Sequence, residues 1–327
     1  MIKKQLMKKI AILFILIVQF ANATIKDSLQ YPNPFSRYYI FLEEEEDDCD
    51  ACGCSANGGS MGFSSMLNNN FIGIRYVYQS YTTKEGVFNN SPWIDENFNT
   101  VQIWSKIPIT KRIQLTALLP YHSNSRDLAS GKESISGLGD FTLMGMYALI
   151  QSKKDSSATY THKLQFGGGV KAPTGKYNVA NNGTLNPSFQ LGTGSWDYLL
   201  VTEYVVKRKQ LGLNSALSYT FKTENQKQYQ FGNQLNYSST LFYFLDMSKV
   251  KVVPQLGFAG EVYASNKQVK QEVIGTKGSI LFSKFGLELG RNKLSFGVNA
   301  MLPINQNLTG GNVKANYRLS FNLNYSL

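Results

Sequence analysis

The chain has 327 residues, of which 13% are aromatic, only 17% are charged and 28 are glycine. Mean hydropathy is -0.22, and after residue 24 no apolar stretch approaches the roughly 20 residues that a membrane-spanning helix needs, which excludes a helical membrane protein. This composition favours many twisted strands over a soluble enzyme with a charged surface.

The formal net charge of +11 is unevenly placed, because residues 24–70 hold eight acidic and two basic side chains. The basic excess therefore lies further along the chain, scattered through turns and polar strand faces, with no basic helix and no recognised nucleic-acid motif. We expect no nucleic-acid partner. Anionic lipid headgroups around the chain, or a cationic lumen within it, account better for this charge.

The first 23 residues have the three parts of a secretory signal peptide. A basic region with Lys3, Lys4, Lys8 and Lys9 precedes an apolar core over residues 10–20, and Ala21 and Ala23 form a small-residue cleavage site. We expect cleavage before Thr24. The alternative, a retained anchor, is less favoured because about eleven apolar residues fall short of the roughly 20 that span a bilayer.

Residues 24–70 show no sustained alternation and contain an acidic run over residues 43–48, three cysteines and a stretch rich in Gly and Ser. This predicts a mostly irregular segment, either a periplasmic extension or a plug inside a lumen. The thiolates of Cys49, Cys52 and Cys54 are spaced to bind one soft metal ion, which the acidic run would help to attract. A disulfide with one thiol left over is the competing interpretation, because the periplasm is oxidising.

From Phe71 onward, segments of alternating polarity are separated by turn residues. They predict twelve strands, near residues 71–81, 98–108, 112–121, 139–150, 160–172, 195–207, 210–222, 228–243, 249–264, 276–290, 293–303 and 313–327. The last strand alternates without a break, with Lys314, Asn316 and Arg318 on its polar face. A period of two with one apolar face suits a wall that has lipid outside and water inside.

The strands run to ten residues or more, whereas those of a secreted β-sandwich, the main alternative, usually have five or six. Closure into a barrel also removes the exposed edges of long strands. The long connections fall mainly after odd-numbered strands, at 82–97, 122–138, 173–194, 265–275 and 304–312. We therefore predict an all-β, transmembrane, antiparallel up-and-down barrel over residues 71–327 in the cell outer membrane, with membrane lipid and the barrel assembly machinery as partners.

Charged residues on the polar strand faces are the candidate lumen and selectivity residues. They are Arg75, Lys106, Asp140, Lys163, Lys171, Asp197, Glu203, Lys251, Glu261 and Arg318. Such charges either set the selectivity of an open pore or form a salt-bridge network that seals the barrel, and the sequence leaves both open.

An outer-membrane lipase needs a serine, a histidine and an orienting polar group together on the lipid-facing wall. The segment His122, Ser123, Asn124, Ser125 has these residue types, but four polar residues in a row are more typical of the start of a loop. We predict that the protein is not an enzyme and assign no catalytic residue.

Three segments carry a family resemblance: Ser136-Gly137-Leu138-Gly139-Asp140, Lys171-Ala172-Pro173-Thr174-Gly175-Lys176 and Gln190-Leu191-Gly192-Thr193-Gly194-Ser195-Trp196-Asp197. In this order they resemble the transporter-like outer-membrane barrels named for the meta-pathway of phenol degradation, over approximately residues 70–327. The cysteine-rich segment is similar to an extension in relatives from Bacteroidota, which are Gram-negative.

The resemblance implies an outer-membrane channel or uptake protein for small, hydrophobic or aromatic solutes. The 173–194 connection either folds inward as a constriction or stays at the surface. The alternative function is a metal-binding or partner-binding module that acts through Cys49, Cys52 and Cys54; a lipase is less favoured. Leu327 stands where such barrels usually have an aromatic residue, so we expect weaker docking onto the assembly machinery.

Overall fold

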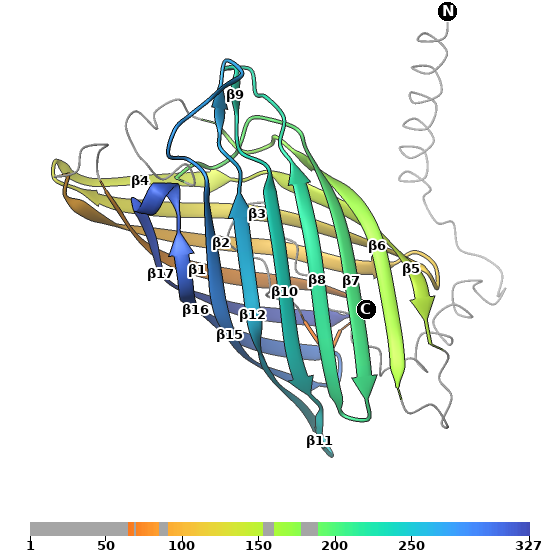
Figure 1. Ribbon diagram of the computed structural model, residues 1–327. Coiled ribbons are helices and arrows are strands. Elements are labelled where there is room, and N and C mark those ends of the chain that lie inside the picture. Colours follow the sequence, from red (N-terminus) through yellow and green to blue (C-terminus); the bar gives the residue numbers. More distant parts are fainter. Residues whose placement is uncertain (1–64, 69, 85–90, 153–159, 178–188) are drawn as a thin grey trace, which may run out of the picture. The chain divides into compact units, whose positions relative to one another are not determined.

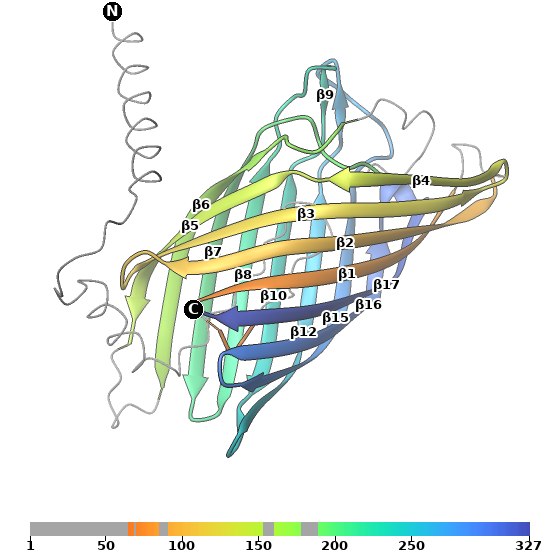
Figure 2. The same cartoon turned by 180° about the vertical axis from the view of Figure 1, so that it is seen from behind.

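A computed structural model describes residues 65–68, 70–84, 91–152, 160–177 and 189–327. The described residues form a closed antiparallel β-barrel with 12 strands around its wall (Figures 1 and 2). Within these ranges no helix is long and apolar enough to cross a membrane. The predicted fold class is confirmed.

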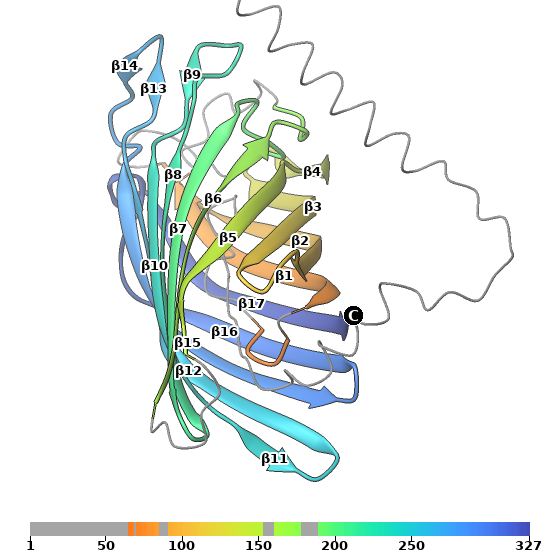
Figure 3. The same ribbon diagram turned by 90° about the vertical axis from the view of Figure 1, so that its right-hand side faces the viewer.

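The wall begins with β1 (Phe71–Lys84), β2 (Trp93–Pro108), β3 (Ile113–Leu128), β4 (Gly131–Leu138), β5 (Phe141–Gln151), β6 (Thr161–Ala172), β7 (Asp197–Arg208) and β8 (Leu211–Phe221). It continues with β10 (Gln234–Tyr243), β11 (Leu245–Met247), β12 (Val250–Tyr263), β15 (Gly278–Arg291), β16 (Leu294–Asn307), the 3-10 turn η1 (Thr309–Gly311) and β17 (Val313–Ser326). The short strands β9 (Tyr229–Gln230), β13 (Lys267–Gln268) and β14 (Gln271–Glu272) form a separate small sheet beyond the ends of β8 and β10 (Figure 3).

Neighbouring strands in the wall follow chain order, and the sheet closes where β17 pairs with β1. Phe71 faces Ser326 in this pair, so both ends of the barrel sequence lie at the same rim. Three connections at this rim have only two residues each, and their first residues, Lys209, Ser248 and Asn292, adopt a φ of 53°, 54° and 53°, as tight hairpin turns require. Short turns mark the periplasmic rim of such barrels.

The two faces of the wall differ as the alternation predicts. On β1, Ile72 and Ile74 are 47% and 55% exposed on the outer face, whereas Arg75 and Val77 are buried on the lumen side. Exposed large apolar side chains recur around the barrel, and most buried side chains of the lumen are polar. This is the reverse of a soluble protein, and it fits a wall with lipid outside.

Two predicted connections are wrong in extent, because they are largely strand. β2 begins at Trp93 and β3 continues to Leu128, where it forms a hairpin with β4. Most side chains of this hairpin are polar, so the backbone ladder continues although the hydrophobic pattern that marks a strand has ended. One wall strand consists of β4 and β5, which are separated at Gly139 and Asp140.

The prediction that Lys314, Asn316 and Arg318 all share one face of the last strand is also wrong. A β-bulge at Asn316 shifts the pairing so that Ser80 faces Tyr317 and Tyr81 faces Ala315. Arg318 is buried in the lumen as predicted, whereas Lys314 and Asn316 are exposed. One extra residue in a ladder moves all later side chains to the opposite face.

Candidate functional site in the barrel lumen

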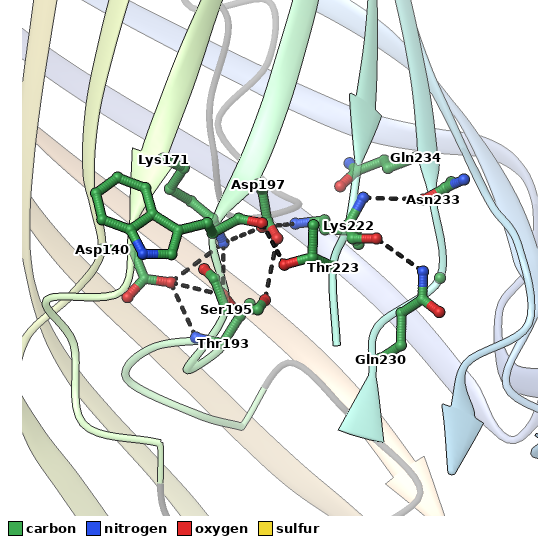
Figure 4. Close-up of polar contacts among 12 residues, drawn as sticks. Asp140, Lys171, Thr193, Ser195, Asp197, Lys222, Thr223, Gln230, Asn233 and Gln234 are labelled. Carbon is green, nitrogen blue, oxygen red and sulfur yellow. Dashed lines mark hydrogen bonds and ion pairs between the residues drawn. The ribbon is translucent and has the colours of Figure 1, made fainter. Parts of the chain in front are cut away.

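Four buried charged groups form a chain of ion pairs inside the barrel (Figure 4). The ammonium group of Lys171, on β6, lies 3.1 Å from Asp140 Oδ2 and 2.6 Å from Asp197 Oδ2. Asp197, at the start of β7, also pairs with Lys222 at 3.1 Å. We call these four residues the charge cluster; two acids and two bases neutralise one another there.

The charge cluster also fixes the backbone of the segments around it. Asp140 accepts hydrogen bonds from the backbone N–H of Gly175 at 3.0 Å and from both the backbone N–H and the hydroxyl of Thr193 at 2.9 Å. Lys171 donates to the Thr193 hydroxyl at 3.0 Å. The three segments that carry the family resemblance, far apart in the sequence, therefore meet at one point of the lumen.

Glycine is required where these segments approach one another most closely. A side chain at Gly192 would place its Cβ 2.5 Å from Asp140 Oδ1, and one at Gly139 would collide with the His122 ring. These two positions need glycine for close approach rather than for an unusual backbone angle. The glycines of the motifs thus allow the 189–195 segment to lie against the break between β4 and β5.

A second buried ion pair lies on the opposite part of the wall. Arg318 donates to Glu261 Oε1 at 2.6 Å and to Oε2 at 3.1 Å, and it also donates to the Tyr81 hydroxyl at 2.6 Å. The Tyr263 hydroxyl donates to the same carboxylate. A two-pronged arginine–carboxylate pair with further hydrogen bonds is the strongest form of such an interaction.

Between the two ion-pair systems lies a cavity of about 150 Å³. Its walls combine aromatic and aliphatic side chains, such as Phe98, Tyr263 and Val77, with amides and hydroxyls, such as Gln234 and Thr309. Gln190, Gly192 and Thr193 contribute the edge that follows β6, so this part of the 173–194 connection lies on the lumen side. Among the described lining residues none is acidic, and Lys222 is the one formal cation.

Two hydrogen-bond acceptors in the cavity wall have no partner among the described residues. They are the amide oxygens of Gln102 and Asn124, whose side chains are 4% and 2% exposed. Thr100 and His122 lie on the same wall and contact each other at 2.9 Å. A buried amide oxygen without a donor is costly, so the cavity favours a molecule that brings one.

The small outer sheet borders the cavity through Phe231 and Asn266. The Asn266 amide donates to the Tyr229 hydroxyl at 2.7 Å and accepts from the Gly232 backbone N–H at 2.8 Å. Burial raises the pKa of Tyr229 to about 12, so this hydroxyl stays protonated at physiological pH. The outer rim of the cavity is therefore neutral at this point.

The periplasmic half of the lumen holds Ser65 and Met66, which precede β1. Glu288 accepts hydrogen bonds from the Ser65 hydroxyl at 2.5 Å and from the Met66 backbone N–H at 2.6 Å. Met66 packs with Val205, Phe242 and Val253. This end of the predicted extension or plug lies in the lumen; its other residues, 24–64, lie outside the described ranges, as do the signal peptide and the cysteine motif.

The structure buries eight of the ten predicted lumen residues at 2% exposure or less: Arg75, Lys106, Asp140, Lys171, Asp197, Glu203, Glu261 and Arg318. Lys163 and Lys251 have the same orientation but are only half-buried, near the periplasmic rim. The sequence gives no basis for the pairing partners of these charges.

Sequence reasoning missed Lys222, Lys284 and Glu288, which are also buried in the lumen. Their positions alternate in phase with polar neighbours, as Lys222 does with Ser218 and Thr220. Carrying the period of two to the end of each strand would have found them.

The arrangement expected of a lipase is not formed by the His122 segment. His122 is buried in the lumen at 5% exposure, whereas Ser123 is exposed on the outer face. Consecutive residues of a strand point to opposite faces, so this serine and this histidine are separated by the wall.

Comparison with known proteins identifies the family of the chain. Residues 75–323 match the family model described as putative MetA-pathway of phenol degradation. The chain is similar to the crystal structure of an outer membrane channel from Pseudomonas putida F1, with a TM-score of 0.59 and 16% identity over 79% of this chain and 96% of that one. It is less similar to the β domain of the Bordetella autotransporter Brka, with a TM-score of 0.45 and 9% identity over 80% and 100% of the two chains.

No curated protein sequence matches the chain. The family match covers all three motif segments, which converge on the charge cluster, and the barrel fold is shared with an outer-membrane channel. The chain belongs to the family described as putative MetA-pathway of phenol degradation.

Proposed function

We propose that the protein is a passive outer-membrane channel for small, hydrophobic or aromatic solutes. The cavity between the charge cluster and the Arg318–Glu261 pair carries this proposal, because it combines apolar walls with a few neutral polar groups. Ligand sites in proteins have this composition, in which apolar surface gives affinity and polar groups set orientation. The outer-membrane channel fold and the family description support it.

The size of the cavity limits the solute. A space of about 150 Å³ is comparable to engineered cavities that bind a single benzene ring. Phe98 and Tyr81 contact each other edge to face at a centroid distance of 5.3 Å and give the cavity an aromatic wall. A molecule with one ring and one polar substituent matches these dimensions better than a sugar or a peptide.

Filling the cavity is expected to reduce solute flux at least about tenfold, because Trp at position 77 occupies the space that a ring would need. Val77→Trp tests this, since Val77 is fully buried in the cavity wall. Ile74→Trp, on the outer face of the same strand, is the matched control. The measurement is uptake of phenol and benzyl alcohol into vesicles that contain the folded protein. Equal uptake by the two variants, or wild-type uptake no faster than that of empty vesicles, contradicts the proposal.

Passage toward the periplasm requires the Ser65–Asn68 segment to leave Glu288. The double variant Ser65→Ala/Met66→Ala removes one hydrogen bond to Glu288 and the packing of Met66 against Val205 and Phe242. We expect faster flux of the same solutes in the same vesicles. Met247→Ala, at a 58% exposed position, should leave the flux unchanged. Unaltered flux in the double variant would mean that this segment does not limit passage.

Two predictions concern properties beyond the channel. We propose that the protein has no catalytic activity, which hydrolysis of short-chain esters by purified protein would contradict. The motif Cys49, Cys52, Cys54 remains a proposed soft-metal or disulfide site that could also engage a periplasmic partner. Metal content after purification under reducing conditions, compared with that of a variant with all three cysteines changed to Ser, distinguishes metal binding from a disulfide.

A further inference from the structure

Three buried cations of the lumen have no ion-pair partner among the described residues. Arg75, Lys106 and Lys284 are 1%, 2% and 1% exposed, and none of them lies within ion-pair distance of a described carboxylate. The other fully buried bases, Lys171 and Arg318, are each paired with acids. Burying an uncompensated charge is costly, so a bound group of opposite charge would stabilise these three side chains.

The surroundings of Arg75 indicate which chemical group would supply this counter-charge. The Cζ atom of its guanidinium lies 3.7 Å from the centroid of the Trp104 ring, which holds the group by its flat face. Nε and Nη2 have no hydrogen-bond partner among the described residues, although they are fully buried. These two nitrogens point their N–H groups in one direction as a parallel fork, and a carboxylate is the group that fits such a fork with both oxygens.

Arg318 is an internal comparison for this fork. Its Nε and Nη2 both donate to the Tyr81 hydroxyl, at 3.2 and 2.6 Å, and Nη1 donates to Glu261. The same side chain, equally buried in the same lumen, is therefore fully paired where the protein uses it for structure. Arg75 has the aromatic support of Trp104, but the described ranges supply no acceptor for its Nε and Nη2.

Lys284, on β15, adds a second cation to the site. Its ammonium group donates to the Thr240 hydroxyl at 3.1 Å. It lies close enough to Arg75 for the two positive charges to repel each other. The charge of Glu288 also acts on Lys284, but the two oxygens of that carboxylate already bind Ser65 and the Met66 N–H. Lys106 follows Trp104 by two residues on the lumen face of β2, and its Nζ has no hydrogen-bond partner in the described part of the chain.

We propose that Arg75 and Lys284, supported by Trp104 and Lys106, form a binding site for a monocarboxylate. The site rests on the proposed channel function and narrows its solute class to small organic acids with an apolar or aromatic part. Gln102, the cross-strand partner of Arg75, lines the cavity, as does Val77 two residues further along β1. A carboxylate on Arg75 would thus leave the apolar part of the solute directed toward the cavity.

Fluorescence of Trp104 tests the site, because the chain has three tryptophans and the other two, Trp93 and Trp196, lie at exposed positions. In a Trp93→Phe/Trp196→Phe background, iodide serves as an anionic quencher and acrylamide as a neutral one. We expect saturable quenching by iodide, competed by benzoate and not by its neutral analogue benzyl alcohol. Equal competition by the two compounds overturns the proposal, as does quenching that saturates neither in this background nor after the acidic run over residues 43–48 has been neutralised.

Variants separate binding from folding. Arg75→Gln and Lys284→Met should each weaken the apparent affinity for benzoate about tenfold, the loss expected for one charge-assisted hydrogen bond. Arg112→Gln, an exposed arginine in the turn before β3, is the matched control. The shift between folded and heat-unfolded bands on a gel verifies that each variant has folded. Unchanged benzoate affinity in both folded lumen variants also overturns the proposal.

The carboxylate could come from a free solute or from the acidic run Glu43 to Asp48 of the same chain. A variant with these six residues changed to Gln and Asn distinguishes the two. If benzoate competes only in that variant, the site is a carboxylate site filled by the chain itself; if it competes in both, free solute fills it. Benzyl alcohol flux measured on the same preparation is a separate readout, so failure of anion binding with intact flux refutes the site and leaves the channel function standing.

Discussion

Replacing Lys171 by Met is expected to lower the free energy of unfolding of the barrel by about 3–5 kcal/mol, the range for breaking a buried ion pair from one side. The ammonium group of Lys171 is shared by Asp140 and Asp197, and all three side chains are fully buried. Its removal leaves Asp140 without a cation and Asp197 with Lys222 alone. Unfolding by urea in phospholipid vesicles, followed by the band shift between folded and unfolded protein, measures the effect.

Lys132→Met, at an exposed position of the β4 hairpin, is the control and should change stability by less than about 0.5 kcal/mol. Because Asp140 also binds Gly175 and Thr193, Lys171→Met should loosen the 189–195 segment and alter solute flux. Adding Asp140→Asn and Asp197→Asn to Lys171→Met should recover part of the lost stability, since no buried negative charge then remains beside the missing ammonium group. A Lys171→Met variant as stable as the control would show that the charge cluster does not hold the barrel together.

Replacing Glu261 by Gln is expected to cost a similar amount, about 3–5 kcal/mol, because Arg318 then keeps its charge in the lumen without a carboxylate. The pair is two-pronged, with distances of 2.6 and 3.1 Å. The reverse change, Arg318→Met, leaves Glu261 unpaired and should cost about as much. The same urea unfolding experiment in vesicles measures both variants.

A double-mutant cycle isolates the pair from its surroundings. Glu261→Leu and Arg318→Met are measured singly and together. The combined change removes both charges and should be less destabilising than either of these two single changes, as for other buried ion pairs replaced by apolar residues. Tyr263 loses its acceptor where Glu261 becomes Leu, and Tyr81 loses its donor where Arg318 becomes Met. Both tyrosines line the cavity. Additive single effects would mean that the two charges do not depend on each other.

The strands of the wall follow closely from the sequence, whereas their extent at the outer rim does not. Alternation over Ile72, Ile74 and Val77 predicts both the strand and its faces, because lipid outside and polar groups inside impose a period of two. The pattern ends at Tyr121, yet β3 continues to Leu128. Beyond the apolar band, neither face needs to be apolar, so the backbone ladder extends without a signal in the side chains.

The sequence predicts which charged residues lie in the lumen, but it does not predict which of them form ion pairs with one another. Asp140, Lys171 and Asp197 stand on polar strand faces and in the family motifs, so they were expected in the lumen. That Lys171 lies between both acids, and that Lys222 completes the cluster, depends on how β6, β7 and β8 bring their ends together. Arg75 and Arg318 look alike in the sequence. Arg318 is nevertheless fully paired, whereas two nitrogens of Arg75 find no hydrogen-bond partner within the residues that the structure describes.

The sequence by itself determined the class of fold, the number of strands in the wall and the side of it on which most charges lie, because these depend on a local period that each strand carries. Only the tertiary structure decided which charges neutralise each other, where the bulge at Asn316 reverses the faces of β17, and that a cavity remains between Val77 and Gln190. These features depend on contacts between residues tens to hundreds of positions apart. Closure of the sheet sets such distances, and no local pattern encodes them.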